Sequence, residues 1–397
     1  MKTLVLYSRY LGTKKASYYD DWLDAFSKDV DFDVTARNIS PPYVKVPSTV
    51  RFTPPITDPS LRWKVSLYKW SYQMYTRVYQ CAVPPFYRRG RIVDLTDVDQ
   101  FDLIVLLHST NANSVTSLTH ILPYLQSRKG KLVCFVGNEY CLMPEKIGFI
   151  KSVAADLIAT QLPIEAAQWL YGDCLMSRVV PIPHALNADN YASLTPRVQR
   201  PVEIGFIGDR YSLAIGDNER SAFIEAVQSL CQMELIPYDI RLGSKLRIPR
   251  KAYTSFLNRV KTVIGAESGT YYLEKTDALF KKVDAYLSFR PRARFGEVHD
   301  RFFKNYHQPV SGKAISSRHF EPIGTQTAQM LLRGHYNGIL RPDEHYIPVR
   351  RDLSDMEEAF AKLADKDTVD QMVERTHQYV MDCHTYDHRI GTLKTYL

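Results

Sequence analysis

One acidic residue, Glu321, stands in a part of the chain where its charge could do chemistry. It belongs to the stretch SSRHFEPIGTQTAQMLLRGHYNGIL at 316–340. The pattern predicts a short extended segment, then a loop that holds Glu321, then a helix with an apolar stripe that ends at Gly334. The first backbone amides of a helix attract anions. Here these amides would be those of Gly324, Thr325 and Gln326.

Two further ionisable residues, His108 and Glu139, lie where predicted strands end. The apolar runs FDLIVLLHST (101–110) and KLVCFVGNE (131–139) predict buried strands. In Rossmann-like sheets the carboxyl ends of the strands face the ligand crevice, so both side chains are candidates to reach a ligand. The structural alternatives are a histidine bonded to a neighbouring loop and a carboxylate on a loop.

The composition indicates a globular protein with two domains. The chain has 397 residues, 45% of them hydrophobic and 24% charged, and this length exceeds one ordinary core. No apolar run is long enough to span a membrane, and MKTLVLYSRYL at the start predicts a strand rather than an export signal. Six cysteines without paired spacing suit a reducing compartment, so we expect a cytoplasmic protein. The net charge of +8 favours polyanionic partners.

Strand-like runs alternate with helical segments along the chain, which predicts α/β architecture with parallel sheets. An N-terminal Rossmann-like domain is expected over residues 1–190, with the C-terminal helix 376–397 joined to it. A second Rossmann-like domain is expected over 195–375, after a polar boundary at 187–201 that contains proline.

A segment between the second and third predicted strands, residues 61–80, repeats apolar and aromatic positions at helical spacing. Basic residues accompany it and continue to residue 91. The segment is predicted to be a helix that either lies on a membrane or acceptor, or packs within its own domain or against a dimer partner.

Three other patterns could bind metals or polyanions. Metal-dependent transferases use an Asp-x-Asp motif, and this pattern occurs at 31–33, 97–99 and 365–367. None of the three follows an apolar strand, so we interpret them as solvated surface. His384 and His388 are one helical turn apart, but no further cluster accompanies them, which favours a structural helix over a metal site. The basic run at 241–261 could bind an anion, although such runs are usually solvated and no nucleic-acid-binding motif accompanies it.

Several segments of the C-terminal half occur together in a recognisable order. They are RHFEPIG (318–324), DLSDMEEAF (352–360) and HTYDHR (384–389), preceded by VVPIPHALNADNY and IGFIGDRY. In order and spacing they resemble glycosyltransferases of the GT-B fold, specifically the bacterial CgeB-like branch of the group 1 glycosyl transferases. The resemblance covers about 178–397, and the N-terminal half matches in architecture only.

The resemblance implies two Rossmann-like domains that face each other across a cleft, with the C-terminal helix returning to the first domain. It implies a metal-independent glycosyltransferase without a cofactor, whose nucleotide-sugar donor, with UDP the expected nucleotide, binds mainly to the C-terminal domain. Glu321 would bind the ribose, because a carboxylate can accept two hydrogen bonds from a vicinal diol. A retaining outcome is expected. However, many retaining members carry a second glutamate eight residues earlier, where this chain has Lys313.

The resemblance also implies roles for single residues. Arg210 and then Arg318 are the first candidates to clamp the diphosphate, because arginine offers a fixed fork of donors. His108 would position the donor sugar. Glu139 is a candidate from its chemistry rather than from the resemblance, because a carboxylate could act as the general base that an inverting enzyme needs. The residues expected to bind the nucleotide sugar are Gly208, Arg210, Lys313, Arg318, Glu321, Gly324, Thr325 and Gln326.

The acceptor is expected to be a glycan, a lipid-linked molecule or a protein. The protein could also lie at the inner face of a membrane, in contact with it through residues 61–91. A nucleic-acid partner is not favoured, but a nucleic-acid-associated protein stays open as an alternative, including one that modifies DNA with sugar. A catalytically idle GT-B scaffold is another. The oligomeric state stays open.

Overall fold

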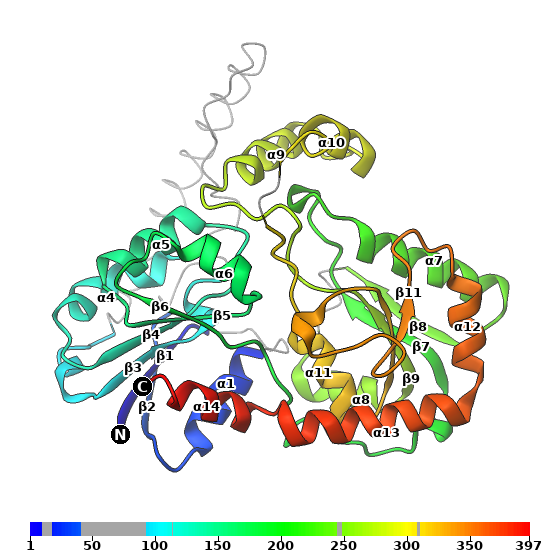
Figure 1. Cartoon of the computed structure of the whole chain (residues 1–397), viewed down its shortest axis with the longest axis horizontal. Helices are drawn as coiled ribbons and strands as arrows, with labels where there is room; N and C mark the ends of the chain where they lie inside the picture. Colours follow the sequence, from blue (N-terminus) through cyan, green and yellow to red (C-terminus); the bar gives the residue numbers. More distant parts are fainter. Residues whose placement is uncertain (10–17, 41–92, 113, 244–247, 308–309) are drawn as a thin grey trace, which may run out of the picture.

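The computed structural model describes residues 1–9, 18–40, 93–112, 114–243, 248–307 and 310–397. Within these ranges the chain forms two α/β units, each built on a parallel sheet (Figure 1). The predicted helix at 61–80 and the segment that continues to residue 91 lie outside the described residues.

The first unit contains a six-stranded parallel sheet in the order β2-β1-β3-β4-β5-β6. Runs such as LIVL in β3 are buried throughout, as expected for a sheet with helices on both faces. The strands are β1 (Lys2–Tyr7), β2 (Asp33–Asn38), β3 (Leu103–Leu106), β4 (Lys131–Phe135), β5 (Leu157–Thr160) and β6 (Arg178–Pro181).

Helices cover both faces of this sheet (Figure 1). On one face, α1 (Tyr18–Lys28) and the last helix of the chain, α14 (Tyr386–Lys394), contribute Trp22, Phe26 and Ile390 to the core. A second core fills the other face. The helices on that face are α4 (Thr116–Ser127), α5 (Met143–Ser152) and α6 (Ile164–Tyr171). The C-terminus of the chain therefore completes its N-terminal unit.

The second unit contains a five-stranded parallel sheet in the order β11-β10-β9-β7-β8. Its strands are β7 (Val202–Gly208), β8 (Tyr238–Leu242), β9 (Val260–Gly265), β10 (Ala328–Leu332) and β11 (Ile347–Val349). Its helices are α7 (Glu219–Met233), α8 (Arg250–Leu257), α11 (Ser317–Gly324), α12 (Met356–Ala364) and α13 (Lys366–Cys383). Separate cores fill its two faces.

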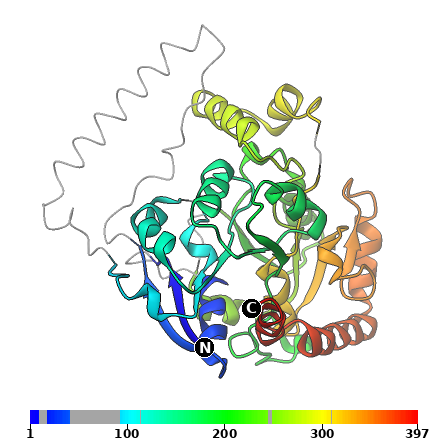
Figure 2. The same cartoon turned by 60° about the vertical axis from the view of Figure 1, so that its left-hand side comes forward.

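A helical hairpin separates β9 from α11 in the sequence. Its helices are α9 (Ala278–Phe289) and α10 (Phe295–Phe302). The hairpin stands apart from both sheets in two views of the molecule (Figures 1 and 2). Val283, Val298 and Phe303 bury its inner side against Ile215 and Cys141, which belong to the two different units.

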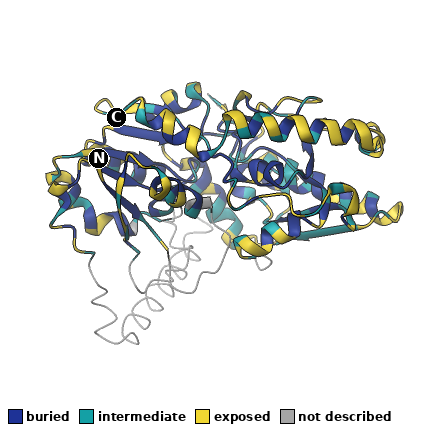
Figure 3. Ribbon diagram, turned by 90° about the horizontal axis from the view of Figure 1, so that it is seen from below, coloured by how far each residue is buried: buried dark blue, intermediate teal, exposed yellow. Residues whose placement is uncertain are grey.

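The chain passes between the units twice, and the two passages lie side by side. The amide of Leu186 donates to the carbonyl of His384 at 3.0 Å, and the amide of Tyr386 donates to the carbonyl of Leu186 at 3.1 Å. The first passage is the linker that follows β6, and the second joins α13 to α14. The inner strands of both sheets are largely buried, while the edge strands β2 and β8 and the outer faces of the helices are more exposed (Figure 3).

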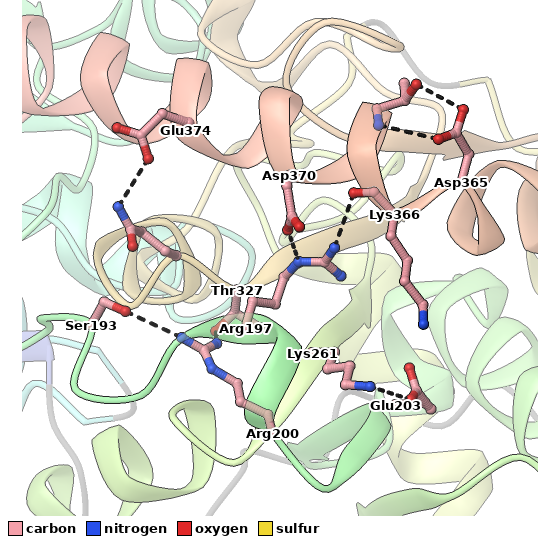
Figure 4. Close-up of polar contacts among 12 residues, drawn as sticks. Ser193, Arg197, Arg200, Glu203, Lys261, Thr327, Asp365, Lys366, Asp370 and Glu374 are labelled. Carbon is pink, nitrogen blue, oxygen red and sulfur yellow. Dashed lines mark hydrogen bonds and ion pairs between the residues drawn. The ribbon is translucent and has the colours of Figure 1, made fainter.

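Arg200 fastens the linker to the second unit (Figure 4). Its side chain is 2% exposed and donates to the carbonyls of Thr195 at 2.9 Å and Thr325 at 2.6 Å, and to the hydroxyl of Thr327 at 2.7 Å. Burial lowers the pKa of Arg200 to about 10, so the guanidinium still carries its charge at neutral pH. A buried cation of this kind is stable only because carbonyl and hydroxyl oxygens surround it.

The predicted order of elements across 316–334 is wrong. Glu321 lies inside α11 rather than in a loop, and the apolar stripe that follows is the strand β10 rather than a helix. A capping box between Ser316 and His319 starts the helix ahead of Glu321. The five residues of β10 are all buried, and periodicity alone does not separate a short buried strand from a buried helix.

Candidate functional site

The first turn of α11 is a tightly organised helix start. The amide of Ser316 donates to Nδ1 of His319 at 3.0 Å, and the amide of His319 donates to the carbonyl of Ser316, also at 3.0 Å. Burial lowers the pKa of His319 to about 4, which keeps the imidazole neutral and able to accept from an amide. The amides of Ser317 and Arg318 also lie in this first turn, where an α-helix offers no carbonyl to accept from them. Such amides make the turn suited to binding an anion.

Glu321 is one turn further along this helix and is 4% exposed. Its carboxylate accepts from the hydroxyl of Tyr191 at 3.3 Å and from Nη1 of Arg318 at 3.1 Å. The Arg318 guanidinium lies over the ring of Tyr253 at 4.1 Å, and its side chain stays 44% exposed. The site therefore joins a buried anion to a cation that reaches the surface.

A carboxylate of the first unit faces this site across the domain junction. Asp21, in α1, is 2% exposed and accepts from Arg250 of α8 at 2.5 Å and from Asn187 of the linker at 2.9 Å. Burial raises the pKa of Asp21 to about 7, and the nearby charge of Glu321 acts in the same direction, against the effect of Arg250. The junction thus holds two buried carboxylates that interact.

A second polar contact between the units lies close to the start of α11. The side-chain amide of Asn337 donates to the carbonyl of Gln161, after β5, at 2.9 Å. Its side-chain oxygen accepts from the amide of Ile315 at 2.8 Å. One asparagine therefore ties the segment before α11 to the strand ends of the first unit.

Lys313 is buried and paired with Asp217, whose side chain has no exposed surface. Its ammonium also lies 4.6 Å from the ring centre of Tyr271 and 5.6 Å from that of Tyr211. In this structure the residue is part of a closed ion pair within the second unit. Its assignment to the donor remains a prediction.

Gly324, Thr325 and Gln326 were expected to open a helix and face an anion, and the structure contradicts this. They end α11 instead. A Cβ on Gly324 would lie 2.4 Å from the carbonyl of Tyr191, so the glycine permits close packing of the helix end on the linker. Thr325 has no exposed surface, and Gln326 donates to Glu374 of α13 at 3.3 Å. The C-terminal end of a helix presents carbonyls, which do not favour an anion.

Two residues after β7 do not meet the α11 site. Arg210 is exposed and pairs with Glu225 of α7, so the expected diphosphate clamp is occupied by a neighbouring carboxylate. Gly208 ends β7 beside the ring of Phe206. The arginine that contacts this loop is Arg220 of α7, which lies 3.6 Å from the ring centre of Tyr211 and donates to the carbonyl of Asp209 at 2.5 Å.

The two strand-end residues of the first unit are interior residues. His108 has no exposed surface and lies against the rings of Trp22, Phe135 and His184, at 6.0, 5.2 and 5.1 Å. Burial lowers its pKa well below the ordinary value, with the charge of His184 acting in the same direction. This position leaves the side chain no exposed surface for a donor sugar, and the role expected for it stays a prediction.

Glu139 is 6% exposed and already bonded to three donors. It accepts from the hydroxyls of Thr160 and Tyr171, each at 2.6 Å, and from the amide of Gln161 at 3.1 Å. Burial raises its pKa, against the effect of these bonds. A carboxylate bonded in this way holds strand ends together, and its role as general base stays a prediction.

Tyr191, Asp21 and Asn337 complete the candidate site and were not identified from the sequence. Tyr191 of the linker bonds Glu321 of α11, the charges of Asp21 and Glu321 interact, and Asn337 bonds the segment before α11. Asn337 has a φ of 54°, typical of an asparagine in a turn. No local pattern marks Tyr191 among the 26 tyrosines of the chain.

A cavity of about 540 Å³ lies next to this junction. Its lining includes Asp21 from α1, Asn187 from the linker and Tyr386 from α14, but Glu321 is not among the lining residues. No group of three or more metal-ligating side chains occurs in the described ranges. Among the helices of those ranges, none is long and apolar enough to cross a membrane.

No known protein-family model matches the sequence, and no curated protein matches it. Solved structures do match. An α-glucosyltransferase in complex with UDP and a 13-mer DNA containing a HMU base aligns with 100% of this chain and 99% of its own, at 10% identity and a TM-score of 0.53. Sucrose-phosphate synthase from Thermosynechococcus elongatus aligns with 100% of this chain and 98% of its own, at 11% identity and a TM-score of 0.49. HepE of Anabaena in complex with UDP-glucose covers both chains fully, at 9% identity and a TM-score of 0.49.

Identities of this size carry information about the fold alone. The two parallel sheets, the double passage between the units and the return of α14 to the first unit agree with the full-length alignment to the α-glucosyltransferase. The expected fold class is therefore confirmed: the chain has the GT-B fold, with two Rossmann-like units.

Proposed function

We propose that this protein is a glycosyltransferase that binds a nucleotide-sugar donor at the start of α11. The observation that carries the proposal is the buried carboxylate of Glu321, bonded to Arg318 and Tyr191 one turn after a helix start. Two bonds leave a carboxylate with acceptor capacity for a diol. An acceptor-only group beside amides and an exposed guanidinium suits a ligand with both hydroxyls and phosphates, such as a nucleoside diphosphate.

In this proposal the ribose hydroxyls of the donor donate to Glu321. The diphosphate lies against the amides of Ser317 and Arg318 and against the Arg318 guanidinium, in place of the expected amides 324–326. Donors fixed in this way stabilise the charge that develops on the leaving diphosphate as the bond to the sugar breaks. The chain's own groups supply this charge stabilisation, so we propose transfer without a metal.

The finer assignments are also proposals. UDP is the first nucleotide to test, because it is the one bound in the α-glucosyltransferase that shares the fold. The acceptor is proposed to be a glycan, a lipid-linked molecule or a protein, and the outcome to be retaining. Lys313 is proposed to contact the donor only if its pairing with Asp217 opens when the donor binds.

A thermal-shift panel of UDP-, GDP-, ADP-, CMP- and dTDP-sugars tests donor binding. At least one is expected to raise the Tm of the wild type, with and without EDTA. Glu321→Ala is expected to lower the affinity for that nucleotide sugar by about 10- to 150-fold, because hydrogen bonds to charged groups contribute about 1.5–3 kcal/mol. Glu374→Ala, which removes an exposed glutamate of α13, is the matched control. If no nucleotide sugar binds, or if both variants bind it like the wild type, the proposal fails.

A further inference from the structure

The α9–α10 hairpin carries an excess of positive charge. Residues 278–307 contain seven basic and three acidic side chains, and all of them lie in the described part of the chain. Six of the basic side chains are exposed. They are Lys282, Arg290, Arg292, Arg294, Arg301 and Lys304.

None of these six cations forms an ion pair with a carboxylate within the described ranges. In the run 241–261, by contrast, Arg241 pairs with Asp239, Arg250 with Asp21 and Asp24, and Lys261 with Glu203. Three cations of that run are therefore paired, while Lys251 and Arg259 are exposed and have no ion pair within the described ranges. The hairpin therefore gathers six exposed, unpaired cations within one short segment, where their charge is available to a partner.

Aromatic rings lie among the exposed cations. The guanidinium of Arg301 lies 5.0 Å from the ring centre of Tyr286 and 5.7 Å from that of Phe302, and the two rings contact each other at 5.3 Å. None of the large apolar side chains of the hairpin is exposed. Insertion into a bilayer needs exposed apolar side chains, so the surface fits a soluble polyanion better than a membrane.

The base of the hairpin is fixed to both units. The carboxylate of Asp277 accepts from the amide of Met143, at the start of α5, at 3.1 and 3.2 Å. Lys281 lies 3.8 Å from Glu145 of the same helix. The Phe303 ring, after α10, contacts Tyr272 at 4.6 Å. The exposed cations are thus held in place beside the junction of the two units.

We propose that the exposed face of the α9–α10 hairpin docks the phosphodiester backbone of a nucleic acid. Four of the six cations are arginines, whose planar fork matches phosphate oxygens. Neutralising successive phosphates releases counterions, so a cluster of this size supports salt-dependent binding. Rings beside the arginines offer faces for unpaired bases. The inference concerns binding without a donor, so it stands or falls independently of sugar transfer.

The test measures fluorescence anisotropy of a labelled 30-base-pair DNA duplex and of one of its strands, without nucleotide sugar, at several NaCl concentrations. The wild type is expected to bind with a steep salt dependence. The triple variant Arg290→Gln, Arg292→Gln and Arg294→Gln is expected to bind at least about ten-fold more weakly at 100 mM NaCl. For the duplex, its log–log salt slope should fall by about two to three, close to one for each lost phosphate contact.

A charge-matched control replaces three exposed cations near β11 and α12, by Arg341→Gln, Arg350→Gln and Lys362→Gln. This control is expected to keep the affinity and the salt slope close to those of the wild type, which excludes a general effect of net charge. Equal losses in both triple variants overturn the proposal, as does an unchanged affinity in the hairpin variant. Hairpin-dependent binding to phosphatidylglycerol vesicles without binding to DNA would also overturn it, and would identify a membrane instead.

Discussion

The hydroxyl of Tyr191 and the carboxylate of Glu321 meet at 3.3 Å, although 130 residues separate them in the sequence. Tyr191 belongs to the linker between the two units, and Glu321 belongs to α11 of the second unit. The linker therefore contributes directly to the orientation of the buried carboxylate that we propose to bind the donor.

Tyr191→Phe removes this bond while keeping the ring. The loss of one long hydrogen bond to a charged group is expected to weaken nucleotide-sugar binding by about 1 kcal/mol, or about five-fold in Kd. Isothermal titration of the nucleotide sugar found in the panel measures the change. Tyr379→Phe is the control, because it removes a hydroxyl that contacts His384 at 2.7 Å and does not contact Glu321. An affinity equal to the wild type in Tyr191→Phe would show that the bond does not orient the site.

Glu139→Gln is expected to lower stability rather than to affect donor binding. Three donors point at the carboxylate, and an amide replaces one acceptor oxygen with a donor group. We expect the free energy of unfolding to fall by about 2–4 kcal/mol, as for a disrupted buried network. Urea denaturation measures this fall, and the Tm increase caused by the nucleotide sugar should persist. A variant of unchanged stability that loses only transfer activity would instead support the role of Glu139 as general base.

Asp21 is expected to make the stability of the protein depend on pH. Its pKa is about 7 in the folded protein, raised from 3.8 mainly by burial. The folded state therefore holds the proton more tightly than the unfolded chain does between about pH 4 and pH 7. Across this window the contribution of Asp21 to the free energy of unfolding falls as pH rises, and it is constant above pH 7.

Asp21→Asn removes this contribution. Relative to the wild type, the variant is expected to gain on the order of 2–4 kcal/mol in stability between pH 4 and pH 8, measured by urea denaturation at each pH. Asp24→Asn removes the other carboxylate bonded to Arg250 and so reports the effect of that bond alone. If the wild type and Asp21→Asn show parallel pH profiles, the carboxyl group does not titrate in this window.

Gly324→Ala is expected to destabilise the junction between α11 and the linker. The new Cβ would lie 2.4 Å from the Tyr191 carbonyl and 2.6 Å from Cδ1 of Leu186, so the helix end and linker must separate, at a cost of about 1–3 kcal/mol. Gly391→Ala in α14 is the matched control. Gly391 lies inside a helix with open space around the position of a Cβ, so the alanine variant should raise the free energy of unfolding by about 0.5–1 kcal/mol. Thermal unfolding of both variants measures the difference, and equal Tm values would contradict the proposed close packing.

Much of the architecture follows from patterns that are local in the sequence. Apolar runs such as KLVCF and LIAT form buried parallel strands, because strands covered on both faces need continuous apolar sequence. The α/β class and the return of the end of the chain to the first unit were both predicted. The predicted helix 376–397 is divided, however, between the end of α13 in the second unit and α14 in the first. The order of helix and strand around Glu321 was not, because a five-residue buried strand has the same composition as a turn of buried helix.

Local sequence patterns do not predict which side chains meet at the candidate site. By itself the sequence determined which residues are chemically able to act: Glu321, Arg318, His108 and Glu139 all have side chains suited to a transferase. Tertiary structure alone decided which of them are placed to do so. Packing buried His108 among aromatic rings and bonded Glu139 to three donors. It also brought Tyr191 and Asp21 to Glu321 from distant parts of the chain. The availability of a charged group depends on burial and on partners that are distant in sequence, and these become defined only when the chain packs.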